Sequence, residues 1–94
     1  MLQTISITVE GLVQGVFYRQ STKAKAVDSG ITGQIKNRPD GSVHIIATGT
    51  ETQLDQLVKW CNKGPEMAIV TNVKVERLPL QTFKTFNIVR DPNK

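Results

Sequence analysis

Apolar and polar residues alternate at the start of the chain, so that Ile5, Ile7 and Val9 fall on one face. Because successive side chains of a strand point to opposite faces, this spacing predicts a strand over residues 4–11. Segment 16–29 then carries residues at near-helical spacing that suit close packing on a sheet: Tyr18, Thr22, Ala26 and Ser29. We expect a weakly amphipathic helix there, ended by Gly30 in the left-handed conformation.

Two further strands are expected over residues 31–37 and 42–48. Between them, the sequence Arg38-Pro39-Asp40-Gly41 has the composition of a tight turn, so these strands should pair antiparallel. Segments 68–78 and 83–90 each contain a short apolar alternation and should hold a fourth and a fifth strand.

The clearest helical pattern follows Gly49. Thr50-Glu51-Thr52-Gln53 has the form of a capping box, in which the first and last residues exchange hydrogen bonds at a helix start. The apolar residues after it recur at i, i+3, i+4 and i+7: Leu54, Leu57, Val58 and Cys61. Gly64-Pro65 should end this second helix.

The resulting order, β-α-β-β-α-β with a short extra strand, indicates an α+β sandwich. It would consist of an antiparallel sheet with both helices on one face. A chain of 94 residues is long enough for one core and not for two, so we expect a single domain over residues 1–94.

Composition and charge limit the binding partners and the cellular location that we expect for the protein. The formal net charge of +4 favours anionic partners in general, but Lys and Arg are scattered along the chain and do not predict a nucleic-acid surface. No apolar run approaches the ~18 residues that a membrane span requires, and the start does not resemble a signal peptide. The single cysteine, Cys61, cannot form an internal disulfide. We therefore expect a cytoplasmic protein without membrane contact and, given its size, a monomer.

A glycine-containing loop between the first strand and the first helix is the strongest candidate for chemistry. Gly11 and Gly15 bracket a turn, and Arg19 follows on the expected first turn of the helix. Backbone N–H groups at a helix start form a cradle for an anion, and a guanidinium matches the geometry of phosphate. The local pattern favours an oxyanion site, most simply a phosphate site.

Geometry connects this loop with Asn37. The first two strands flank a β-α-β crossover and so run parallel, which brings the loop and Asn37 to the same edge of the sheet. Arg19 and Asn37 should then face a common cleft, where the asparagine amide could orient a water molecule. Spacing alone leaves the alternatives open that Arg19 is a surface cation and Asn37 a turn residue.

The other reactive side chains have no partners at a recognisable spacing. His44 is expected on the solvent face of a strand, and Cys61 is expected in the core. No metal site is predicted from them.

The loop sequence V-x-G-x-V-Q-G-V-x-[FY]-R, here Val9 to Arg19, closely resembles the first signature of the acylphosphatase family. Gly30-x-x-Gly33 followed by Asn37-x-x-Asp40-Gly41-x-Val43 resembles the second signature. Both occur in the right order, and the resemblance covers nearly the whole chain.

The resemblance implies a ferredoxin-like fold and hydrolysis of acyl phosphates to a carboxylate and inorganic phosphate. It implies that Arg19 binds the phosphoryl group and that Asn37 positions the attacking water. The phosphate loop would comprise Gln14, Gly15, Val16, Phe17, Tyr18 and Arg19, acting largely through backbone N–H groups. No metal, cofactor or covalent intermediate is implied, and the ligand would be an acyl phosphate or phosphate itself.

Three residues depart from the family pattern. Gln34 replaces a usual aromatic and should loosen packing beside the strand of Asn37, while Ser29 replaces a common leucine and should remove a core side chain. Tyr18 replaces a phenylalanine, so its hydroxyl needs a partner if it is buried.

Two other functions compete with hydrolysis. Gln34 and Ser29 are compatible with an anion-sensing domain that binds phosphate without turnover. RNA-binding domains of the RRM type share the same element order, but they carry stacking aromatics on their central strands. Segments 5–7 and 42–46 of this chain have none.

Overall fold

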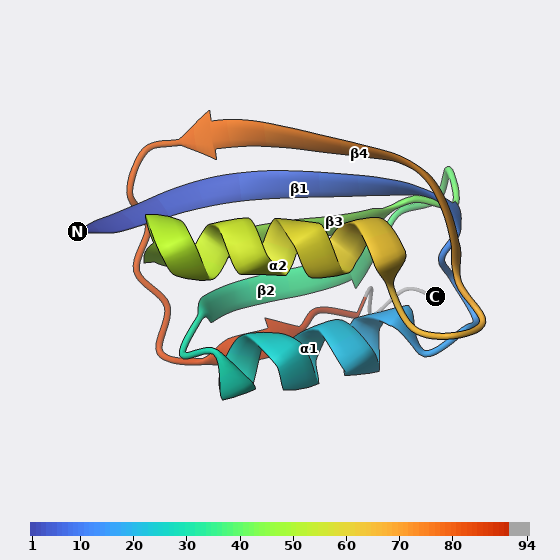
Figure 1. Ribbon diagram of the computed structural model, residues 1–94, viewed down its shortest axis with the longest axis horizontal. Coiled ribbons are helices and arrows are strands. Elements are labelled where there is room, and N and C mark those ends of the chain that lie inside the picture. The colour runs from blue at the N-terminus through green and yellow to red at the C-terminus, as the bar shows by residue number, and fades with distance from the viewer. Residues whose placement is uncertain (91–94) are drawn as a thin grey trace.

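The computed structural model describes residues 1–90. Its helices and strands, in chain order, are β1 (Leu2–Leu12), α1 (Tyr18–Asp28), β2 (Thr32–Asn37), β3 (Val43–Thr50), α2 (Glu51–Lys63), β4 (Ile69–Leu78) and β5 (Phe86–Ile88). The predicted order of elements is confirmed (Figure 1). None of the helices in this part of the chain is long and apolar enough to cross a membrane.

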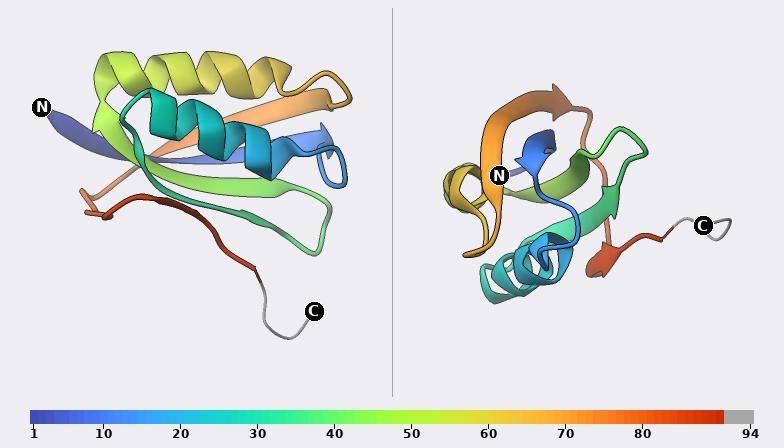
Figure 2. Two further views of the ribbon diagram at one scale, coloured as in Figure 1. Left: turned by 90° about the horizontal axis from the view of Figure 1, so that it is seen from below. Right: turned by 90° about the vertical axis from the view of Figure 1, so that its right-hand side faces the viewer.

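The strands form one sheet in the order β4-β1-β3-β2-β5. The first four pair antiparallel, and both helices cover the same face of the sheet (Figure 2). The short strand β5 joins the edge beside β2 and runs parallel to it. As a result β1, β2 and β5 all run in the same direction, toward the side of the molecule that lies at the right of Figure 1.

A small polar cluster at the opposite side explains how β5 reaches this edge. The hydroxyl groups of Thr4 and Thr48 lie 2.7 Å apart, and the backbone of Gln81 bonds to both of them. Gln81 belongs to the segment that crosses the end of the sheet from β4 to β5. The crossing segment is thereby fixed, and β5 starts at the far edge in the direction of β2.

The core lies between the sheet and the two helices. The predicted strand face of Ile5, Ile7 and Val9 is buried, as is the predicted Cys61. Leu57 of α2 is 1% exposed. Complete burial of one such side chain is worth about 1.5–3 kcal/mol, so these contacts hold the helices on the sheet.

Helix α1 begins two residues later than the sequence indicates. Phe17 has φ 64°, a left-handed conformation that an α-helix cannot contain, and the helix starts at Tyr18. Its end is as predicted: Gly30 has φ 78°, and the N–H of Ile31 donates to the carbonyl of Ala26 at 2.9 Å.

Helix α2 has the predicted capping box. The N–H of Gln53 donates to the hydroxyl oxygen of Thr50 at 3.2 Å, and the N–H of Thr50 donates to Oε1 of Gln53 at 2.8 Å. Two of the backbone donors at this helix start therefore have side-chain partners.

Two of the three departures from the family pattern, Gln34 and Ser29, lie outside the buried core. Gln34 is half-buried and alternates with the fully buried Ile35, so it occupies the face of β2 away from the helices. Ser29 is half-buried at the end of α1, and its carbonyl accepts a hydrogen bond from Nε2 of Gln53 at 2.9 Å. The expected loosening of the core has no counterpart at these positions.

Candidate active site

Two adjoining cavities open where β1, β2 and β5 end. The first, of about 290 Å³, lies against the loop before α1 and is called the loop cavity; its lining includes Gly15, Phe17 and Gln20. The second, of about 420 Å³, lies against the β2–β3 turn and is called the turn cavity; its lining includes Arg38 and Pro39. Both are lined by four polar residues, which are Gln14, Arg19, Asn37 and Arg90. The structure thus brings the predicted pair, Arg19 and Asn37, to a common cleft.

The start of α1 presents unpaired backbone donors to the loop cavity. The first hydrogen bond of the helix runs from the N–H of Ser21 to the carbonyl of Phe17, at 3.0 Å. Helix geometry leaves the preceding N–H groups without a partner inside the helix. Among the described residues no side chain caps this end, and its first turn contains no acidic residue. The positive end of the helix dipole is therefore available to an anion.

The loop reaches this arrangement through two left-handed residues. Gly15 has φ 76° and Phe17 has φ 64°. Left-handed residues in a turn direct backbone N–H groups toward a common point, which is the geometry of an anion-binding concavity. The conformation suits glycine and is strained for phenylalanine, and such strain is concentrated at functional sites.

Arg19 supplies the charge at this site. It is the second residue of α1 and is half-buried. Burial, followed by the neighbouring positive charge of Arg90, lowers the pKa of its guanidinium. Both causes disfavour the cation in the free site, and the attraction of a bound anion would offset them.

Asn37 is the last residue of β2. It lies two residues after the buried Ile35, so its side chain is on the same, helix-covered face of the strand. Its Oδ1 is buried and has no hydrogen-bond partner among the described residues. A buried acceptor without a partner costs about 1–3 kcal/mol, and native proteins rarely retain one without a reason. In this position Oδ1 could accept a hydrogen bond from a ligand or from a water molecule.

Gln14 has a role that the sequence did not reveal. Its Nε2 donates to the carbonyl oxygens of Arg38 at 2.8 Å and Ser42 at 2.9 Å. These two hydrogen bonds connect the loop before α1 to the β2–β3 turn. The Gln14 side chain therefore fixes the loop relative to the strand that carries Asn37.

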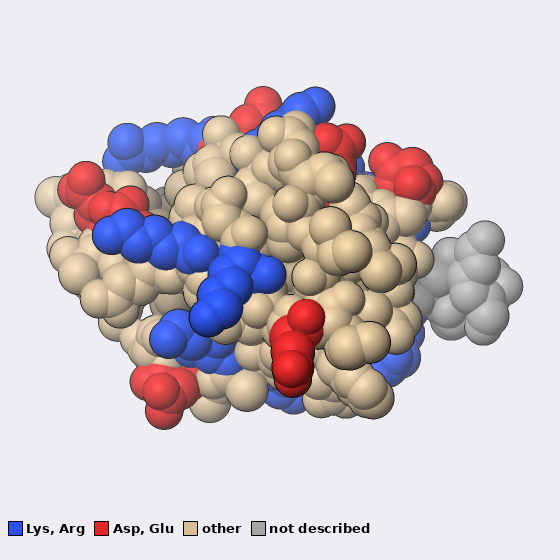
Figure 3. All heavy atoms as spheres, turned by 45° about the vertical axis from the view of Figure 1, so that its right-hand side comes forward, with Lys and Arg blue, Asp and Glu red and all other residues tan. Residues whose placement is uncertain are grey.

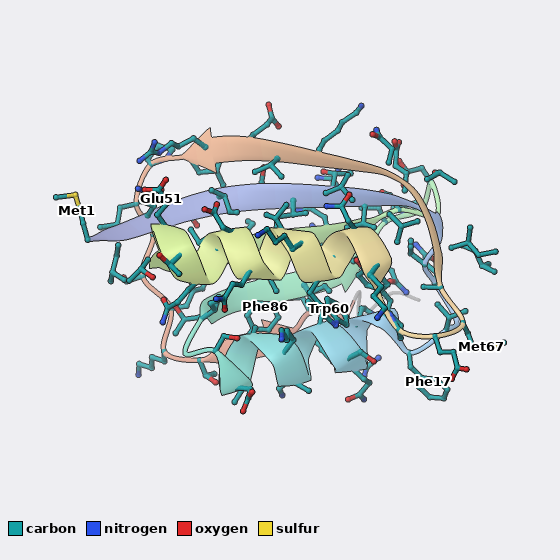
Figure 4. All side chains as sticks on the ribbon, in the orientation of Figure 1. Met1, Phe17, Glu51, Trp60, Met67 and Phe86 are labelled. Carbon is teal, nitrogen blue, oxygen red and sulfur yellow. The ribbon has the colours of Figure 1, made fainter. Side chains whose placement is uncertain are left out.

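The remaining predicted loop residues direct their side chains elsewhere. Val16 is half-buried against the core, and Phe17 is 78% exposed and projects outward (Figure 4). Tyr18 is buried: its hydroxyl donates to the carbonyl of Cys61 at 2.6 Å, and its ring lies 5.6 Å from that of Trp60. The expected partner for this hydroxyl is confirmed, and burial raises the pKa of Tyr18 above its usual value. These residues can serve an anion only through their backbone.

Arg90 was missed by the sequence reasoning, although it lines both cavities. It follows β5, whose pairing with β2 matches Ile88 with Ile35. The apolar alternation of segment 83–90 predicts a strand but does not identify its neighbour. The only signal in the sequence was a cation at the end of a predicted strand segment, the place that Asn37 occupies on β2.

No metal centre is found in residues 1–90, where no three His, Cys, Asp or Glu side chains are grouped to hold an ion. Cys61 is buried, which raises the pKa of its thiol to about 12. His44 is half-buried and lines neither cavity; burial, then the charges of Arg38 and Lys36, lower its pKa. Neither residue belongs to the cleft.

Positive charge does not form one block on the face shown in Figure 3. Lys and Arg side chains occupy several separate places there, with Asp and Glu between them. This distribution differs from the continuous basic stripe of a nucleic-acid surface.

Comparison with known proteins identifies the family of the chain. The family model described as Acylphosphatase matches residues 5–88. The acylphosphatase of Marinobacter nauticus is 48% identical over 81 residues, covering 85% of this chain and 88% of that protein. The acylphosphatase structure from Coxiella burnetii superposes with a TM-score of 0.91 at 35% identity, covering 94% of this chain and 93% of the other. That from Bacillus subtilis gives a TM-score of 0.91 at 35% identity, with 96% and 100% covered. The chain belongs to the acylphosphatase family.

Proposed function

We propose that this cleft hydrolyses acyl phosphates, with Arg19 and the start of α1 binding the phosphoryl group and Asn37 orienting the attacking water. The observation that carries the proposal is the pairing of two unsatisfied features in one cleft. Within residues 1–90, these are the helix start beside Arg19, which no side chain caps, and the buried Oδ1 of Asn37, which has no hydrogen-bond partner.

The proposed reaction needs little from the protein beyond position and charge. The water oxygen bonds to phosphorus, and the bond from phosphorus to the acyl oxygen breaks. The electron pair of that bond leaves with the carboxylate, and the water protons end on phosphate and solvent. Charge on the phosphoryl oxygens is stabilised by the backbone donors and Arg19, which are in place before the reaction.

Metal independence is part of the proposal. An acyl phosphate has a carboxylate as leaving group, which departs without Lewis-acid help, and a guanidinium with helix N–H groups can replace a cation at the phosphoryl oxygens. Asn37 has no proton-accepting group in the relevant range, so it would orient the water and not deprotonate it.

The experiment is an assay with a simple acyl phosphate in the presence of a chelator. We expect turnover by the unaltered protein and a loss of about 10²–10³ in kcat for Arg19→Ala or Asn37→Ala, the usual cost of removing one preorganised group. Arg77→Ala and Asn62→Ala are matched controls, because both residues are exposed and lie outside the two cavities. Full activity in either cleft variant would refute the role given to that residue, and activity that requires an added metal would refute the mechanism.

We also propose the domain organisation, the cellular location and the oligomeric state of the protein. One buried core joins the sheet to both helices, which supports a single domain over 1–94, although the last four residues lie outside the described part. The lone cysteine is buried and forms no disulfide within the described residues, which supports a cytoplasmic location. We expect a monomer, to be checked by light scattering.

A further inference from the structure

We propose that Arg90 is a second phosphoryl-binding cation of this cleft, which makes the site prefer a dianionic phosphoryl group. The proposal rests on the function proposed above and concerns the charge state of the ligand. It assigns a task to a residue beyond the segment that the family model matches.

The position of Arg90 is fixed by the sheet. The N–H of Val89 donates to the carbonyl of Ile35 at 2.8 Å, and the N–H of Gly33 donates to the carbonyl of Thr85 at 3.0 Å. Between these bonds Phe86 is completely buried in the core. The backbone that carries Arg90 is thereby held beside β2. Ile88 pairs with Ile35, and Arg90 lies two residues after Ile88, as Asn37 lies two residues after Ile35.

Its surroundings are suited to an anion. Arg90 lines both cavities, as Arg19 does, although it is exposed overall. The charged groups that face it are Arg19 from α1 and Arg38 from the β2–β3 turn, and the described lining residues include no carboxylate. Its charge acts on Arg19 strongly enough to contribute to the lowered pKa of that residue. Two cations that line the same cavities repel each other, and a dianion between them adds two attractions that outweigh this repulsion.

The alternative explanation is that Arg90 is a surface cation surrounded by water and makes no contact with the ligand. It would then contribute only to the general positive field around the cleft, as Arg38 also does from the turn cavity. The two explanations differ in a measurable way. A direct ligand contact gives a larger effect for Arg90 than for Arg38, and it depends on the charge of the phosphate.

The test measures the affinity of inorganic phosphate by calorimetry, at pH values on both sides of its second ionisation. For Arg90→Gln we expect the dissociation constant of the dianion to rise about tenfold at low salt, the typical value of one hydrogen bond to a charged group. The affinity for the monoanion should fall by a smaller factor, so the variant should prefer the dianion less strongly than the unaltered protein does. Arg90→Lys should restore part of the affinity because it retains the charge without the planar fork.

Three further variants separate the explanations. Arg77→Gln, on β4 and outside both cavities, controls for net charge. Arg38→Gln should raise the dissociation constant by less than Arg90→Gln. His44→Gln should retain the dianion preference, because His44 lines neither cavity. Thermal unfolding of each variant verifies that it folds.

Kinetics adds a readout that a structural role would not change. If Arg90 binds substrate and transition state alike, Arg90→Gln should raise KM for an acyl phosphate and change kcat little, whereas Arg19 variants should lose kcat. An unchanged phosphate affinity in Arg90→Gln, or an equal loss in Arg38→Gln, would overturn the proposal. Because phosphate binding is measured directly, a protein that binds phosphate through Arg90 but does not hydrolyse acyl phosphates would refute the proposed function alone.

Discussion

The two helices of this protein begin in opposite ways. Helix α2 starts with a complete capping box between Thr50 and Gln53 and has Glu51 in its first turn, which suits the positive end of the helix dipole. Helix α1 follows the left-handed Phe17, has no side-chain cap among the described residues, and places the cation Arg19 at its positive end. One start is capped and complements the helix dipole, and the other is open, as the proposed phosphate site requires.

The open start carries a cost in stability. A missing cap is worth about 1 kcal/mol, a left-handed non-glycine residue about 1–3 kcal/mol, and an unfavourable charge at a helix end about 0.3–1 kcal/mol. Packing immediately after the start offsets these terms: Tyr18, Thr22 and Ala26 are buried, and Tyr18 is bonded to the backbone of α2. The start of α1 therefore lacks the cap and the negative charge that usually stabilise a helix start, and the proposed anionic ligand would supply both.

The largest effect is expected from changing the cation of the open start. Arg19→Lys should lower kcat/KM by about 10²–10³, because a lysine cannot reproduce the paired donors of a guanidinium at a phosphoryl group. Stability should not fall, since the open helix start gains nothing from a cation. Steady-state kinetics and thermal unfolding test both points, with Arg77→Lys as control. Retention of more than about a tenth of the activity would argue against a paired contact.

A smaller effect is expected from making the start of α1 resemble that of α2. Gln20→Glu adds an acid to the first turn beside the loop cavity. It should stabilise the fold by about 0.3–1 kcal/mol and weaken phosphate binding by up to about fivefold, because the carboxylate competes with the ligand for the same dipole. Gln56→Glu, exposed on α2, adds the same charge away from the cleft. If both variants bind phosphate equally, the dipole of α1 has no special part in binding.

Removing the cap of α2 should give the reverse result. Thr50→Ala removes the side-chain acceptor of the capping box and should cost about 1 kcal/mol, or about 4–8 °C in Tm for a domain of this size. Catalytic constants of the folded protein should be unchanged. A loss of kcat without a loss of stability would mean that α2 contributes to the cleft in a way not visible in its contacts.

The smallest effect concerns pH. The pKa of His44 is lowered from 6.5, chiefly by burial, so the folded protein binds fewer protons at this residue than the unfolded chain does. Its contribution to stability is therefore complete above the ordinary histidine pKa and is lost as pH falls through the lower, folded value. His44→Gln should flatten this slope in chemical unfolding and leave the pH profile of kcat unchanged. A changed kcat profile would connect His44 with the cleft.

Different parts of the molecule were predictable from sequence to different degrees. Helix α2 was predictable, because its apolar period and its capping box indicate the same helix. The start of α1 was not, because the left-handed conformation of Phe17 arises from the loop as a whole. The meeting of Arg19 and Asn37 followed from the parallel directions of β1 and β2. Arg90 could not be placed, because a three-residue strand has too little pattern to reveal its partner.

The most direct test of the central claim is an amide NMR titration of the protein with inorganic phosphate. We expect the largest shifts at the backbone N–H groups of residues 15–19 and small shifts at those of residues 51–53, the first turn of α2. Arg19→Met should abolish the shifts at 15–19 at phosphate concentrations that saturate the unaltered protein. Equal shifts at the two helix starts, or no saturable shift at residues 15–19, would contradict the assignment of the open start of α1 as the phosphate site.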